Sequence, residues 1–306
     1  RDLLGSRGLR DVYKRQGATA SGGKLVMNAG SSGDDSGGYV SLLSGSSSSQ
    51  SSGDFKIQTL HGTNGMSGSL KIESGASSDG GSGAFAMHSG NAESGSGGNI
   101  SVVAGTGKGD VGGSITMNAG LASGSGGAIT ISSGSGSSKS SGNMMIGTNN
   151  GGSDGVSGHL SLSSGTSSNG KSGDIIVASG EGTSGSGGNM SIVVGRGSND
   201  TGGSISLNAG TSSGSDAGGN VSLSTGRGKD KSSGLLKIAT ENAGGDGLSG
   251  SLIVSSGTTS KGSSGNMTLI SGTASTGGGG GGSIVVGTGA TASGGKLVMN
   301  AGSSGD

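Results

Sequence analysis

The sequence contains no cysteine, no proline and no tryptophan, and only 1% of its 306 residues are aromatic. Without cysteine there is neither a disulfide framework nor a thiolate metal site, and the redox compartment cannot be read from the composition. Only 27% of the residues are hydrophobic, so the chain cannot build a thick core of the conventional kind. There is also no run of about 18 apolar residues, so the sequence predicts no membrane-spanning helix.

An excess of charge of one sign is also lacking, because 18 Lys and Arg residues balance 18 Asp and Glu residues. Nucleic acids and anionic membranes attract clustered basic side chains, and here basic residues cluster only within residues 1–16. We therefore expect no nucleic-acid partner. His61, His88 and His159 lack a recurrent carboxylate partner, so we expect no catalytic residue, no enzymatic activity and no cofactor.

The two ends of the chain differ from what lies between them. Residues 1–16 lack any Gly/Ser rhythm, and DVYKRQ, Asp11 to Gln16, resembles a translated transposase-end sequence from a DNA sequencing library. We interpret residues 1–16 as a non-native leader. Residues 17–34 and 289–306 are identical (GATASGGKLVMNAGSSGD). We therefore expect residues 17–306 to be a repeat array that is truncated at both ends.

Glycine, with 78 residues, is abundant and follows a regular pattern. From Gly22 onward the chain divides into nineteen repeats of about 15 residues with the consensus (G/S)-G-x-Φ-x-Φ-x-x-G, where Φ is apolar, followed by a Ser/Gly-rich stretch. Position two is Gly, and positions four and six are apolar, in every repeat. The repeats begin at residues 22, 37, 52, 67, 82, 97, 112, 126, 141, 157, 172, 187, 202, 218, 233, 249, 264, 281 and 294.

The alternation of apolar and polar residues at positions three to six is typical of a half-buried strand. The Gly-rich remainder indicates a turn, where Gly permits positive φ and close approach of two backbone segments. One repeat can bury only two side chains, so stability requires stacking of repeats. We predict an all-β fold, a parallel β-solenoid with two repeats, about 30 residues, in each coil and the apolar residues in a thin core.

A second periodicity of six repeats, about 90 residues, is superimposed on the first. Position nine is Gly in 16 of the 19 repeats, and the exceptions recur at every sixth repeat together with an altered turn. An Asn-Ala-Gly triplet follows the same six-repeat period. We predict that the altered turns make lateral contacts between molecules or attach a partner. The alternative is that they relieve accumulated twist or record duplication of a 90-residue ancestor. The three exceptions are Leu60, Asn149 and Glu241, and the triplets begin at Asn28, Asn118, Asn208 and Asn300.

Five Asn-x-Ser/Thr motifs are possible acceptors of N-linked glycans in a secreted protein. Four of them begin at position three of a repeat, and the fifth lies in a turn. An Asn before the first apolar residue and a Ser or Thr two residues later could also follow from the repeat itself. The four motifs in repeats begin at Asn99, Asn189, Asn220 and Asn266, and the turn motif begins at Asn199.

Turns rich in Gly and Asp, such as Gly151–Gly155 and Gly244–Gly247, are similar to calcium-binding repeats. Such sites need an Asp at the same position of each coil, and here the Asp residues fall at different positions. We therefore expect no metal site. Ice binding requires a lattice of identical outward side chains, whereas position five mixes Ser, Thr and Lys with Val26 and Ile176.

Three kinds of fibrous protein resemble this sequence. The stretch SIVVGTGATASGG, Ser283 to Gly295, is similar to the heads of trimeric bacterial adhesins, and the repeat length is similar to that of viral fibre shafts. In composition and rhythm, residues 17–306 resemble Gly/Ser-rich surface repeat proteins of algae and other protists. That resemblance implies a secreted structural filament or cell-surface coat protein that associates with itself. The alternative is an adhesin stalk or an ice-binding β-solenoid that presents one repeated face.

Overall fold

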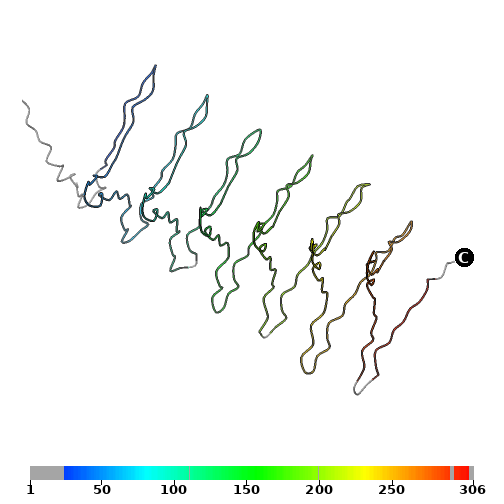
Figure 1. The fold of residues 1–306 in the computed structure, drawn as a ribbon. Helices are drawn as coiled ribbons and strands as arrows, with labels where there is room; N and C mark the ends of the chain where they lie inside the picture. Colours follow the sequence, from blue (N-terminus) through cyan, green and yellow to red (C-terminus); the bar gives the residue numbers. More distant parts are fainter. Residues whose placement is uncertain (1–23, 110, 199, 290–292, 303–306) are drawn as a thin grey trace, which may run out of the picture. The chain divides into compact units, whose positions relative to one another are not determined.

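The computed structural model of the chain describes residues 24–109, 111–198, 200–289 and 293–302. Within these ranges the backbone forms extended stretches that alternate with chain reversals, and it contains no helix and no β-strand (Figure 1). The chain divides into two units, Arg1–Ser157 and Gly158–Asp306. This division falls at the start of the repeat that begins at residue 157. The predicted leader, residues 1–16, lies outside the described residues.

The prediction of an all-β parallel solenoid is wrong. The described residues form no sheet, and none of them is buried, so positions four and six do not line a core. The chain exposes 30967 Å² of surface. A folded protein of the same mass would expose about 11,000 Å². Two-repeat coils, and the stacking of altered turns along one edge of a solenoid, therefore have no counterpart in the structure.

The alternation of side chains on which that prediction relied is nevertheless present. In the repeat that begins at residue 141, Met144 at position four is 47% exposed and Met145 at position five is 95% exposed. In the repeat that begins at residue 172, the values are 55% for Ile175 and 83% for Ile176. Neighbouring residues of the same type thus lie on opposite sides of an extended backbone.

Two side-chain interactions confirm that positions five and seven share the other side. The Nζ atom of Lys71 lies 2.8 Å from Oε2 of Glu73. In another repeat, Nδ2 of Asn208 donates a hydrogen bond of 2.9 Å to Oγ of Ser206. Each pair joins position five to position seven, two residues apart, which an extended backbone places on the same side. We call this the outward side.

The extended stretches do not pair into sheets, and ten of the chain reversals are closed by a single backbone hydrogen bond without a continuing ladder. The N–H of the Gly at position two donates to the carbonyl of the Gly at position nine of the preceding repeat, with N···O distances between 2.8 and 3.1 Å. A sheet needs several such bonds in register, and Gly-rich segments specify register weakly. The ten donor–acceptor pairs are 38–30, 53–45, 113–105, 127–120, 142–134, 203–195, 219–210, 234–226, 280–272 and 295–287.

These hydrogen bonds also correct the start of one repeat. Gly280 donates to Gly272 and Gly295 donates to Gly287, so the repeat predicted to begin at residue 281 begins at residue 279. The intervals from 264 to 279 and from 279 to 294 are then both 15 residues. Position four of this repeat is Gly282, so the apolar residue at position four is not invariant.

Positive φ angles are rarer than the glycine content suggests. Among the described residues only Gly262, at 113°, and Gly277, at 114°, have positive φ. The expectation that glycine serves the turns by adopting positive φ is therefore wrong for most of them. The other proposed reason for glycine in the turns, the close approach of two backbone segments, applies to many more positions.

Candidate functional site

Position two of one repeat lies against position eight of the preceding repeat, and we call this contact the crossing. A Cβ atom on Gly98 would lie 3.1 Å from Cβ of Ser89, and one on Gly113 would lie 3.2 Å from Cβ of Ala104. Ser89 also donates a hydrogen bond of 2.8 Å from its Oγ to the carbonyl of Gly98. At these two crossings, lack of space accounts for the Gly at position two. At others, such as those of Gly83 and Gly265, an added Cβ would make only ordinary contacts at 3.8 and 3.9 Å.

Position eight was not predicted as part of a contact, although the sequence carries its signal. This position holds only Ala, Ser, Thr or Val in all nineteen repeats, counted from the corrected start. Ser89, Ala104 and Ala209, all at position eight, belong to the few half-buried residues in the described part of the chain. A small side chain is therefore a requirement of the crossing, and larger residues would separate the two segments.

The residue at position eleven helps to close several of the turns beyond the crossing. In some turns with Ser at this position, the hydroxyl oxygen accepts a backbone hydrogen bond, as Ser32 does from the N–H of Asp35 and Ser47 from that of Gln50, both at 3.0 Å. Such turns are characteristic of Ser. Where it is Gly, the chain closes more tightly, and a Cβ on Gly62 would lie 2.7 Å from the carbonyl oxygen of Gly65.

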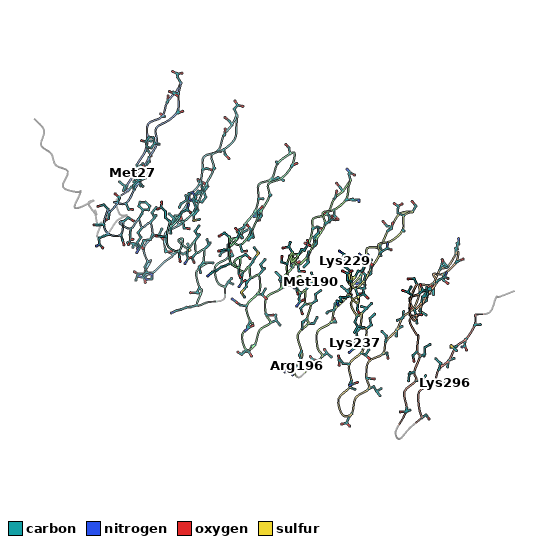
Figure 2. All side chains as sticks on the ribbon, in the orientation of Figure 1. Met27, Met190, Arg196, Lys229, Lys237 and Lys296 are labelled. Carbon is teal, nitrogen blue, oxygen red and sulfur yellow. The ribbon has the colours of Figure 1, made fainter. Side chains whose placement is uncertain are left out.

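The crossings bring neighbouring repeats into contact, but no part of the described chain buries the apolar side chains. We define the apolar face as the apolar side chains at positions four and six, 37 residues in the corrected repeats. Figure 2 labels two of them, Met27 and Met190, which are 56% and 52% exposed. No apolar side chain of the described residues is buried. Some residues depart from the pattern: Leu269 on this face is 95% exposed, whereas Val26 and Val298 on the outward side are only 54% and 56% exposed.

The altered turns predicted to make lateral contacts carry exposed residues. Leu60 is 74% exposed, and Asn149 and Glu241 are exposed as well. The lateral contact predicted at these turns stays a prediction.

Each altered turn ends, directly before the next repeat, in an apolar residue that is more exposed than Leu60 and that was not predicted from the sequence. We call these three the tip residues, and their exposures lie between 95% and 99%. In two of the turns a backbone hydrogen bond from Gly155 to Gly152 and from Gly247 to Gly244 closes the loop just before the tip residue. In the sequence, the tip residues can be recognised as apolar residues that recur in a polar turn at every sixth repeat. The tip residues are Met66, Val156 and Leu248.

The four predicted glycan acceptors at position three, Asn99, Asn189, Asn220 and Asn266, are all exposed. The fifth, Asn199, lies outside the described residues.

The three histidines are exposed and occupy different positions in their repeats. His61 is at position ten, His88 at position seven and His159 at position three. Among the described residues, no group of three or more His, Asp or Glu side chains could hold a metal ion. The same residues include no helix long and apolar enough to cross a membrane. Comparison with protein-family models, curated proteins and solved structures gives no match for this chain.

Proposed function

We propose that this chain is a structural protein that associates with further copies of itself, as a filament or surface coat outside the cell. The observation that carries the proposal is the apolar face, which recurs in every repeat and which no other part of the described chain covers. Exposed apolar surface of this extent is unfavourable in water and is reduced by association. The proposal needs no catalytic residue and no cofactor.

The area of the apolar face is sufficient for a stable interface. At about 60% exposure, 37 aliphatic, Met and Phe side chains present about 2,000 Å² of apolar surface. A standard protein interface needs about 800 Å² from each partner. Half of the apolar face would therefore suffice to hold two copies together.

A second copy of this chain is the partner that fits best. The apolar residues recur at intervals of about 15 residues, so only a surface with the same period can contact successive repeats. The equal numbers of acidic and basic residues also mean that copies do not repel one another through net charge. An assembly built in this way grows in length with the number of repeats, as a fibre or coat requires.

Sedimentation velocity of the full chain tests the proposal. We expect the monomer of 28.2 kDa to give way to larger species as the concentration rises from nanomolar to high micromolar, because apolar surface is buried on association. Electron microscopy of the larger species should show elongated particles. A chain that stays monomeric over the whole range would refute the proposal.

A variant at the tip residues tests whether the altered turns join filaments laterally. In Met66→Ser/Val156→Ser/Leu248→Ser, three almost fully exposed apolar side chains are removed, which together could contribute about 5 kcal/mol to a contact. We expect filaments to form but to lie singly in electron micrographs instead of in bundles. The control Leu43→Ser/Val111→Ser/Leu121→Ser removes three exposed apolar residues outside the altered turns. Equal bundling of the two variants would contradict the lateral contact.

A further inference from the structure

Position three of each repeat lies on the outward side, opposite the apolar face. Two apolar residues at this position show it directly, since Tyr39 is 89% exposed and Leu235 is 88% exposed. Their neighbours at position four, Val40 and Leu236, are 55% and 54% exposed. A group attached at position three would therefore extend away from the apolar face of the same repeat.

We infer that position three is a glycosylation site in the repeats that carry Asn there with Ser or Thr at position five. All four acceptor asparagines are exposed, and so are the hydroxyl residues that complete the motifs. Positions three and five share the outward side, so the acceptor amide and the hydroxyl lie on the same side of an extended backbone. The acceptors are Asn99, Asn189, Asn220 and Asn266, and the hydroxyl residues are Ser101, Ser191, Ser222 and Thr268.

The reaction requires a polyprenyl-diphosphate-linked oligosaccharide and the oligosaccharide transferase of a secretory pathway. The amide nitrogen Nδ2 of the asparagine forms a bond to the anomeric carbon of the first sugar. The bond between that carbon and the phosphate oxygen breaks, and the polyprenyl diphosphate leaves with the electron pair. The amide proton passes to a base of the transferase. No oxidant or reductant is involved.

The placement of the acceptors makes glycosylation compatible with self-association. A glycan is bulky and strongly hydrated, so at position four or six it would block the apolar face. At position three it extends from the opposite side of the same extended stretch. The inference goes beyond the proposed structural function, because it concerns the outward side and holds whether or not the chain assembles.

One repeat provides an internal control, because it has Asn at position three without the motif. Asn143 is followed by Met144 and by Met145, whose side chain is 95% exposed. The substitution Met145→Thr completes a motif at Asn143 without removing a packed side chain. The opposite control, Ser101→Ala, retains Asn99 and removes only its hydroxyl partner.

The experiment is secretion of the full chain, preceded by a supplied signal sequence, from a eukaryotic host. Peptide N-glycosidase converts each glycosylated Asn to Asp, and peptide mass spectrometry then locates the sites. We expect conversion at the four acceptors, its loss at Asn99 in Ser101→Ala, and its gain at Asn143 in Met145→Thr.

Two outcomes would overturn the inference. If Asn143 gains a glycan in Met145→Thr while the four natural acceptors remain unmodified, position three is accessible but the natural motifs are not used. If no site is modified in any variant, position three is not an acceptor position. Sedimentation of the deglycosylated chain separately tests self-association, so failure of one proposal does not imply failure of the other.

Discussion

The variant Ile115→Asp/Ile129→Asp/Leu160→Asp/Ile205→Asp should remain monomeric at concentrations at which the natural chain assembles. All four residues are at position four and between 52% and 55% exposed, so each retains roughly half of its surface for a contact. Loss of that contact costs about 1 kcal/mol for each side chain, which lowers the association constant on the order of a thousandfold. A carboxylate in a desolvated interface adds a further penalty.

The matched control places the same four charges one residue further along the chain. Thr116→Asp/Thr130→Asp/Ser161→Asp/Ser206→Asp changes only outward residues at position five, and it alters the net charge equally. We expect this variant to sediment like the natural chain. If the two variants assemble equally well, the apolar face is not the interface. If neither assembles, charge repulsion accounts for the loss and the face has no specific role.

The same positions show why part of the structure could be predicted from the sequence and part could not. Which side of the backbone a residue lies on depends only on local extended geometry, so the difference between Met144 and Met145 follows from the alternation alone. A strand also requires a partner in register, and fifteen-residue repeats rich in Gly and Ser contain little that fixes a register. The sequence therefore predicted the apolar positions but not their burial.

One repeat start was mispredicted for a related reason. Six consecutive glycines, residues 277–282, satisfy the Gly of position two at several alternative starts. The apolar pair Ile284 and Val286 then favoured a start at residue 281. In the structure, Val286 is 38% exposed and occupies position eight, where a Cβ on Gly295 would lie 2.6 Å from its Cγ1 atom. A small side chain stands at position eight for either start, Thr288 or Val286, so only the hydrogen bonds donated by Gly280 and Gly295 fix the start at residue 279.

The candidate site was predicted only in part from the sequence. The altered turns at Leu60, Asn149 and Glu241 were found because a consensus Gly is missing there. The tip residues were overlooked because isolated apolar residues in turns carry no periodic signal within one repeat. Only comparison across six repeats shows that each altered turn ends in such a residue. The crossing was overlooked because its two members belong to different repeats.

A second variant should weaken the crossings themselves. In Gly98→Ala/Gly113→Ala/Gly127→Ala/Gly188→Ala, each new Cβ would lie 3.1 to 3.2 Å from an atom of the preceding repeat. Neighbouring atoms must move apart, at a cost of about 1 kcal/mol or more for each site. The hydrogen bonds that Gly113 and Gly127 donate lengthen as a result. We expect amide hydrogen exchange at residues 113 and 127 to become about 5- to 30-fold faster.

The control for this variant shifts every substitution to the preceding glycine, at position one. A Cβ on Gly97 has no atom within 4 Å, and on Gly112, Gly126 and Gly187 the nearest atom lies 3.7 to 3.9 Å away. Alanine there fits without displacement and restricts the unfolded chain, so exchange at residues 113 and 127 should stay the same or become slower. Equal acceleration in both variants would mean that loss of glycine flexibility controls the turn. In that case, close approach would not be the reason for the invariant Gly at position two.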